Sequence, residues 1–300
     1  MLDEKLHVPV MLQEVLDFLK LSAGQTIVDA TLGTGGHSLE ILKKITPGGR
    51  LVGIDRDENS LAICRQRLAD FKDSTEFVHG NFADLDKILE GLGINKIDGI
   101  VFDLGISSYQ LGDPQRGFSF QEEGPLDMRL DKSSYISAYD LVNNLNENEI
   151  SQMLWNFGQE RWHNRIAHLL VQERRNEPIA TTKQLANLVM RAIPHRYRRS
   201  YYRIHPATRT FQAVRIAVNR ELEILESTIK KAVDILRKQA RICVISFHSL
   251  EDRAIKHTFR ALKAGGLIEI ITPKPLTPNP NEIEANPSSR SSKFRVAERI

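Results

Sequence analysis

The sequence predicts an α/β protein with a doubly wound, mostly parallel sheet, and three observations support this. Apolar stretches typical of strands alternate with helical stretches through the N-terminal third of the chain. The first strand, at 26–31, runs into a turn with glycines at 33, 35 and 36, where the backbone can approach a ligand closely. A second strand ends at Asp55. A glycine turn followed after about twenty residues by a strand-terminal acid is typical of a nucleotide-binding fold, in which the carboxylate receives ribose hydroxyls.

The predicted elements follow in order along the chain. Strands are expected at 26–31 (TIVDAT), 50–55 (RLVGID), 75–80 (TEFVHG) and 98–105 (DGIVFDLG), with helices at 37–45, 57–70 and 83–91 between them. After Gly105 the alternation stops, and the chain becomes loop-rich and then helical. Apolar residues recur at helical spacing from Phe211 to Leu236, which predicts one long amphipathic helix. The strand RICVISF, at 241–247, follows it.

The interruption predicts a helical domain inserted into the sheet domain. We expect residues 1–112 and 206–300 to form the sheet domain and residues 113–205 to form the inserted domain. The stretches 267–272 and 294–300 predict a terminal antiparallel hairpin on the mostly parallel sheet. A loop rich in proline and asparagine joins them, and we expect it to be extended.

The composition is that of an ordinary soluble globular protein, with 41% hydrophobic and 26% charged residues. No apolar run approaches the roughly 18 residues of a membrane span, and the N-terminus lacks an apolar signal core. Cys64 and Cys243 have no C-x-x-C partner, which predicts buried thiols in a reducing cytoplasm rather than disulfides or a metal site.

The net charge is only +3, but the charge is unevenly distributed. Between residues 113 and 157 there are eight acids and three Lys/Arg, whereas between 158 and 215 there are twelve Lys/Arg and three acids. The stretch 196–215 interleaves arginines with aromatics, a pattern that favours RNA because guanidinium groups contact phosphates and aromatic rings stack on unpaired bases. A solvated charged face is the alternative. The candidate RNA-binding residues are Arg196, Arg198, Arg199, Tyr201, Tyr202, Arg203 and Arg209.

The glycine turn also discriminates between nucleotide cofactors. A dinucleotide fold needs a third glycine where Ser38 stands, and a Walker loop needs a Gly-Lys-Ser/Thr that is missing here. Asp29, four residues before Gly33, favours the D-x-x-x-G-x-G entry typical of S-adenosylmethionine methyltransferases. An ordinary tight turn is the alternative.

Asp103 is the candidate catalytic residue, because it follows an apolar strand at the edge where open α/β sheets bind ligands. An exocyclic amine has a delocalised lone pair and needs a hydrogen-bond acceptor to favour attack, which Asp103 could provide. Phe82 could stack on an adenine or be a core aromatic. Ser249 and Asp252 resemble a capping box at a helix start, beside His248, which could reach the cleft.

In segments spread over almost the whole chain, the sequence resembles the RsmH (MraW) family of bacterial small-subunit ribosomal RNA cytosine-N4 methyltransferases. The segments are HVPVMLQEVL at 7–16, VDATLGTGGHS at 28–38, GIDRD at 53–57, DGIVFDLGISSYQL at 98–111, RGFSF at 116–120, GPLDMR at 124–129, HPATRTFQAVRIAVNREL at 205–222, ISFHSLEDR at 245–253 and NPSSRSSKFRVAER at 286–299. Two local departures are QLG at 110–112 and FGQE at 157–160.

The resemblance implies a class I S-adenosyl-L-methionine-dependent methyltransferase domain with an inserted helical substrate-recognition domain. It implies methylation of N4 of one cytidine, at position 1402 in the usual bacterial numbering, in the decoding region of 16S rRNA in the small ribosomal subunit. The cofactor contacts that it implies are Gly35, Gly36, His37, Asp55, Phe82, Asp103 and Gln110.

Other functions stay open beside this one. A DNA amino-methyltransferase is disfavoured because DLGISS stands where those enzymes usually carry an Asn/Asp/Ser-Pro-Pro-Tyr/Phe tetrad. An RNA-binding ribosome assembly factor without turnover would keep the fold but not the chemistry. A nicotinamide oxidoreductase is disfavoured by Ser38 and Asp29. Exposed amphipathic helices would also permit a homodimer.

Overall fold

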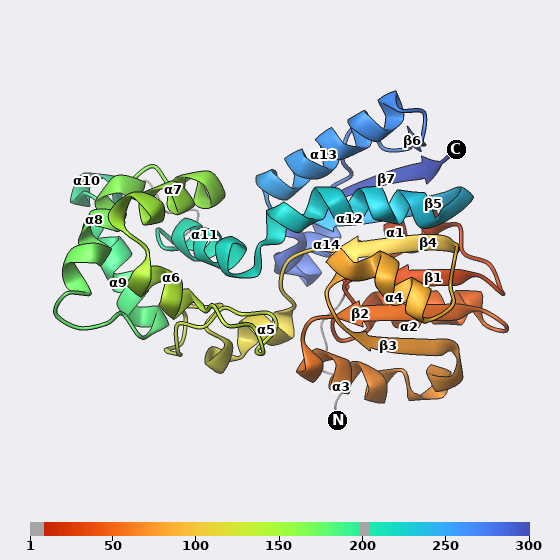
Figure 1. The fold of residues 1–300 in the computed structure, drawn as a ribbon, viewed down its shortest axis with the longest axis horizontal. Coiled ribbons are helices and arrows are strands. Elements are labelled where there is room, and N and C mark those ends of the chain that lie inside the picture. Colours follow the sequence, from red (N-terminus) through yellow and green to blue (C-terminus); the bar gives the residue numbers. More distant parts are fainter. Residues whose placement is uncertain (1–8, 199–204) are drawn as a thin grey trace. The chain divides into compact units, whose positions relative to one another are not determined.

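The computed structural model describes residues 9–198 and 205–300, without the side chains of residues 196 and 198. Contacts within the chain divide it into two compact units (Figure 1). We call Met1–Ser107 with Leu222–Ile300 the sheet unit, and Ser108–Glu221 the helical unit. This division includes helix α11 (Thr208–Asn219) in the helical unit, whereas the predicted boundary at 205/206 assigned it to the sheet domain. The substrate-recognition role of the insertion stays a prediction.

The sheet unit contains a seven-stranded sheet with the strand order β3-β2-β1-β4-β5-β7-β6. The strands are β1 (Thr26–Asp29), β2 (Arg50–Asp55), β3 (Thr75–His79), β4 (Ile97–Asp103), β5 (Leu236–Ser246), β6 (Ile268–Ile270) and β7 (Lys293–Arg299). The first five strands pair in parallel, and β7 runs antiparallel to both β5 and β6. The predicted class I methyltransferase fold, a mostly parallel sheet with a terminal antiparallel hairpin, is confirmed.

Helices cover both faces of this sheet (Figure 1). One face packs on α1 (Leu12–Leu19), α2 (Gly36–Ile45) and α3 (Glu58–Arg67), and the other on α4 (Leu85–Gly91), α12 (Glu221–Ile235) and α13 (Ser249–Ala264). Neighbouring strand residues divide between the two layers: Ile27 belongs to the first core cluster and Val28 to the second. Since successive strand side chains point to opposite faces, a strand buried on both sides is apolar throughout, which is why these strands were readable in the sequence.

The predicted long helix from Phe211 to Leu236 is broken at one residue and ends one residue early, since β5 begins at Leu236, before the predicted strand start at 241. Arg220 has φ 53°, in the left-handed region, and separates α11 from α12. The apolar spacing continues through this break, so periodicity alone could not reveal it. The proline-rich loop near the C-terminus also differs from the expected extended chain. It contains α14 (Pro280–Ala285), and Oε1 of Glu282 accepts a 2.6 Å hydrogen bond from the backbone N–H of Met11.

The helical unit consists of short helices joined by tightly hydrogen-bonded loops. Besides α11, these are α5 (Ser108–Gly112), α6 (Ala138–Asn144), α7 (Glu147–Gly158), α8 (His163–Glu173), α9 (Thr182–Ala192) and α10 (His195–Arg198). Capping boxes begin α6, α7 and α9, which explains where these helices start. Gly158 lets α7 pack closely on α11, because a Cβ there would lie 2.6 Å from the carbonyl oxygen of Arg209. No helix in the described part of the chain is long and apolar enough to cross a bilayer.

Candidate functional site

Three aspartates end three neighbouring parallel strands of the sheet unit. Asp29 ends β1, Asp55 ends β2 and Asp103 ends β4, and β1 lies between the other two strands. Because the carboxyl ends of parallel strands meet at one edge, these three carboxylates share the edge where open α/β sheets bind ligands. The positions of Asp55 and Asp103 at this edge agree with the prediction from sequence, in which Asp29 was only part of a motif.

The glycine turn between β1 and α2 needs glycine for two separate reasons. Gly33 and Gly35 have φ 51° and 79°, a region that other L-residues rarely adopt. A Cβ on Gly35 would in addition lie 2.5 Å from Sγ of Cys64 on α3. The turn therefore packs closely against α3, and a side chain at position 35 would force Cys64 to move.

Asp29 fixes the glycine turn through two hydrogen bonds. Its Oδ2 accepts a 2.7 Å hydrogen bond from the Ser38 hydroxyl, and its Oδ1 accepts one from the backbone N–H of Thr31. Burial raises the pKa of Asp29 to about 6, and the two hydrogen bonds oppose part of that rise. Ser38, which the sequence analysis noted only as a missing glycine, thus has a positive role: it ties the first turn of α2 to the end of β1.

Asp55 lies directly against the glycine turn. Its Oδ2 accepts a hydrogen bond from the backbone N–H of Gly33 at 2.7 Å, and its Oδ1 accepts one from the N–H of Asp57 at 2.8 Å. Burial raises its pKa to about 6. A carboxylate offers about four lone-pair positions, so these two bonds orient Asp55 and leave capacity for hydroxyl donors.

Asp103 is fixed at its backbone but not at its side chain. Its N–H donates to the Thr31 hydroxyl at 2.6 Å, whereas its buried Oδ1 has no hydrogen-bond partner among the described residues. Its side chain is 19% exposed, so the carboxyl group is close to solvent without being surrounded by it. Burial raises the pKa of Asp103 well above its usual value, and the negative charges of Asp29 and Glu251 raise it further.

His37 stands beside Asp103 in the first turn of α2. Its Nε2 lies 2.9 Å from the carbonyl oxygen of Val10, and since a carbonyl only accepts, Nε2 carries the ring proton. Its Nδ1 lies 3.7 Å from Oδ2 of Asp103. Burial lowers the pKa of His37 to about 4, so the ring is neutral at physiological pH.

Phe82 begins the short helix η3 (Phe82–Asp84) and is half-buried. Its ring packs edge-on against Phe102 of β4, with ring centres 5.7 Å apart. The interpretation of Phe82 as a core aromatic is therefore confirmed by its contact with Phe102, and stacking on an adenine stays a prediction. Gln110 is buried on α5 of the helical unit, while the other six expected cofactor contacts lie in the sheet unit.

The predicted capping box at the start of α13 is shifted by one residue. His248 is the N-cap, and Oε2 of Glu251 accepts the backbone N–H of Phe247 at 2.9 Å. Asp252 instead binds Arg295 at 2.7 Å and Lys293 at 3.1 Å, and so ties α13 to β7. The prediction failed because an imidazole nitrogen takes the place of the usual hydroxyl or carboxylate acceptor at the N-cap.

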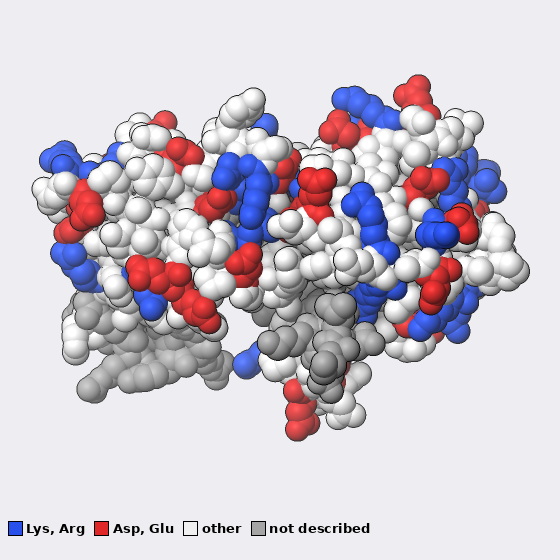
Figure 2. Space-filling view, turned by 90° about the horizontal axis from the view of Figure 1, so that it is seen from below, with Lys and Arg blue, Asp and Glu red and all other residues white. Residues whose placement is uncertain are grey.

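The structure describes only part of the predicted RNA-binding stretch. Arg199, Tyr201, Tyr202 and Arg203 lie outside the described residues, as do the side chains of Arg196 and Arg198 on α10. Arg209, on α11, donates to the carbonyl oxygen of Gln159 at 3.3 Å. On the face drawn in Figure 2, Lys and Arg lie among Asp and Glu, so the described residues there show no continuous band of one sign.

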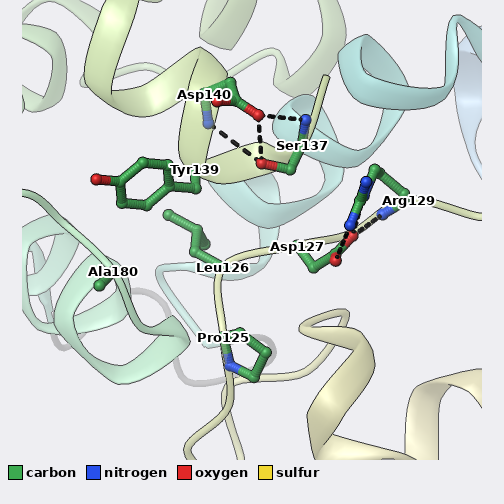
Figure 3. A pocket seen from close by; sticks show the side chains of 8 residues that line it. All are labelled: Pro125, Leu126, Asp127, Arg129, Ser137, Tyr139, Asp140 and Ala180. Carbon is green, nitrogen blue, oxygen red and sulfur yellow. Dashed lines mark hydrogen bonds and ion pairs between the residues drawn. The ribbon is translucent and has the colours of Figure 1, made fainter. Parts of the chain in front are cut away.

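A cavity of about 310 Å³ in the helical unit was not foreseen from the sequence (Figure 3). Its charged lining residues are already paired. Arg129 binds Asp127 through both oxygens, at 2.8 and 2.7 Å, and Asp140 accepts from Ser137 at the start of α6. The polar groups of this cavity therefore stabilise the loop before α6, and the strand-end carboxylates remain the better candidate for chemistry.

Comparison with known proteins places this geometry in context. The model of the MraW methylase family matches residues 4–300. The ribosomal RNA small subunit methyltransferase H of Halothermothrix orenii is 45% identical, over 98% of this chain and 98% of that protein. The proteins of the same description from Clostridioides difficile and Geotalea uraniireducens are 42% and 46% identical, over 98% of this chain and at least 98% of theirs.

Proposed function

The chain belongs to the MraW methylase family, and from this premise we propose that it methylates N4 of a specific cytidine in the decoding region of 16S rRNA, with S-adenosyl-L-methionine as methyl donor. At the coarser level it is a methyltransferase of small-subunit ribosomal RNA, as its relatives are described. The N4 atom, the cytidine and the roles of single residues are the finer part of the proposal.

The residues at the sheet edge fit a cofactor with a ribose and a positive charge. At its three glycines the turn offers a backbone without side chains, and Asp55 has lone pairs for two ribose hydroxyls beyond the bonds that orient it. The unpartnered Oδ1 of Asp103 suits a cationic donor such as an ammonium group. Phe82 would lie against the adenine. When bound, the cofactor supplies an electrophilic methyl group on a sulfonium.

Asp103 is also the group that we propose to act on the acceptor amine. The N4 lone pair of cytidine is delocalised into the ring, and a carboxylate that accepts a hydrogen bond from N4 would localise it. Methyl transfer leaves one proton too many on N4, and the Asp103 carboxylate can take up that proton. Thr31, through the backbone N–H of Asp103, holds the carboxylate at the strand end.

The observation that carries the proposal is the orphaned Oδ1 of Asp103 beside an intact glycine turn. The test is transfer of a labelled methyl group from S-adenosylmethionine to three acceptors: small ribosomal subunits from a strain without this activity, free 16S rRNA and duplex DNA. Transfer to subunits or free rRNA supports the proposal and says which is the substrate. Equal transfer to duplex DNA would favour a DNA amino-methyltransferase. RNA binding without transfer would favour an assembly factor.

A further inference from the structure

The helical unit carries a cluster of two rings and one guanidinium group, of which only Tyr197 belongs to the predicted RNA-binding stretch 196–215. Arg161 lies 5.3 Å from the ring centre of Trp162 and 5.3 Å from that of Tyr197. The two rings are themselves 5.2 Å apart. Arg161 precedes α8, and Tyr197 lies on α10, so the cluster joins two segments that are distant in sequence (Figure 1). We call these three residues the stacking cluster.

The guanidinium group of the stacking cluster is available to a ligand. Arg161 is exposed to solvent, and within the part of the chain that the structure describes it has ring contacts but no ion-pair partner. Two rings hold its planar group in place, so less side-chain entropy is lost when its N–H donors bind a ligand. This arrangement is suited to an anion that also presents a flat face.

The surroundings of the stacking cluster favour a negatively charged partner. In the stretches 150–165 and 190–198 the only acid is Glu160, and it is fully buried. Trp155, on α7, is 55% exposed and packs its ring 5.2 Å from that of His163. An exposed aromatic ring therefore lies on the same short stretch of chain, 155–163, as Arg161 and the half-buried Trp162.

We propose that Arg161, Trp162 and Tyr197 form a platform on which an unpaired nucleotide of the substrate RNA stacks, with its phosphate on the guanidinium group. The inference rests on the proposed function, because it takes the macromolecular substrate to be RNA. Single-stranded nucleic acids are bound by aromatic faces interleaved with basic side chains, and each stacked base contributes a sequence-tolerant share of the affinity. The platform thus holds a nucleotide that flanks the target, which itself must be unpaired to react.

Tryptophan fluorescence gives a direct test, because the chain has only two tryptophans and both, Trp155 and Trp162, lie on this stretch. Titration of the full chain with a single-stranded oligonucleotide of the decoding-region sequence should quench its emission. In Trp155→Phe, Trp162 is the sole reporter and the quench should persist. An oligonucleotide of equal length with abasic sites should quench little. Equal quenching by the abasic oligonucleotide would overturn stacking.

Charge variants test the guanidinium group separately. Arg161→Gln should weaken oligonucleotide binding roughly tenfold and lower the slope of log K against log salt by about 0.7. Arg161→Lys should restore the salt slope but not the affinity, since an ammonium cannot stack. The matched control is Arg175→Gln, which removes the same charge from an exposed arginine of the helical unit that contacts no ring among the described residues. Equal affinities for the Arg161 and Arg175 variants would overturn the inference.

The two proposals fail in different ways. If wild-type protein methylates rRNA but shows no quench and no effect of Arg161→Gln, the stacking cluster is a structural contact between α8 and α10 and the proposed function stands. If RNA quenches the emission but no methyl group is transferred, the stacking platform stands and the proposed function fails. Binding to protein-containing subunits with no affinity for free oligonucleotide would point to a protein partner and overturn the inference.

Discussion

Nδ1 of His37 faces Oδ2 of Asp103 at 3.7 Å, and when Asp103 is ionised neither atom carries a proton. The ring proton of His37 is on Nε2, where it binds the Val10 carbonyl. Two acceptors that face each other at this distance are stabilised when Asp103 is protonated or when a ligand places a donor beside them. The raised pKa of Asp103 agrees with the first state. A cationic cofactor would supply the second, so the pair favours the arrival of positive charge at the strand edge.

The pKa of Asp55 predicts how cofactor affinity changes with pH. Ribose hydroxyls donate to the carboxylate form, and burial raises the pKa of Asp55 to about 6. Affinity for S-adenosylmethionine should therefore be constant above that pH and fall up to tenfold per unit below it. Calorimetric titrations between pH 5 and pH 8 check this, with Asp55→Asn as the variant that should bind weakly and lose the pH dependence assigned to Asp55. An unchanged slope in Asp55→Asn would assign the titration to another group.

Asp29 should make folding stability fall as the pH rises. Its pKa is raised to about 6 in the folded protein, so the folded state binds the proton more tightly than the unfolded chain, and stability is lost as the pH rises from about 4 to above 6. Relative to Asp29→Asn, the stability of the wild type should fall by about 2 kcal/mol between pH 4.5 and pH 7.5. Urea denaturation of both proteins at pH 4.5 and pH 7.5 measures the difference. A difference independent of pH would contradict the assignment.

Gly35→Ala should lower the free energy of unfolding more than an alanine does at another glycine with positive φ. Both Gly35 and Gly24 have positive φ, at 79° and 85°, but a Cβ on Gly24 meets nothing within 4 Å, whereas one on Gly35 meets Sγ of Cys64. Gly24→Ala therefore measures backbone strain alone, at about 1 kcal/mol, and Gly35→Ala adds about 1–3 kcal/mol for overpacking. Denaturation midpoints give both values. If adding Cys64→Ala to Gly35→Ala recovers none of the lost stability, the steric explanation fails.

The shifted cap of α13 makes a prediction that the sequence reading would have reversed. Asp252→Asn should destabilise by about 3–5 kcal/mol, because Arg295 is 6% exposed at its side chain and would be left as a buried unpaired cation. Ser249→Ala should change stability by less than about 0.5 kcal/mol, since the N-cap is His248. Thermal unfolding measures the loss of stability in each variant. A loss in Ser249→Ala as large as that in Asp252→Asn would identify Ser249 as the N-cap.

The sheet and two of the strand-end acids, Asp55 and Asp103, could be predicted because they depend on local patterns. Strands buried on both faces are apolar throughout, and a strand-terminal acid after a glycine turn needs no knowledge of distant residues. The contacts that fix the site were less accessible. His37 contacts Val10, which is 27 positions away, and Asp103 contacts Thr31, which is 72 positions away. No sequence pattern predicts contacts between residues so far apart.

The remaining failures have the same physical origin. The break at Arg220 changes one backbone dihedral and leaves the apolar period intact. The stacking cluster joins Arg161 to Tyr197 through tertiary packing, so the sequence showed that both lie in the basic stretch 158–215 but not that they are in contact. Family resemblance supplied the nucleobase and the cofactor contacts, which periodicity and composition could not name.

The most direct test of the central claim is the rate of methyl transfer by Asp103→Asn at saturating cofactor, with the product nucleoside identified by mass spectrometry. Wild-type protein should produce N4-methylcytidine in 16S rRNA. The variant should retain measurable cofactor binding and lose transfer by about 10²-fold or more, because an amide cannot take up the proton from N4. Transfer by Asp103→Asn at the wild-type rate, or a different methylated nucleoside in the wild-type product, would contradict the account.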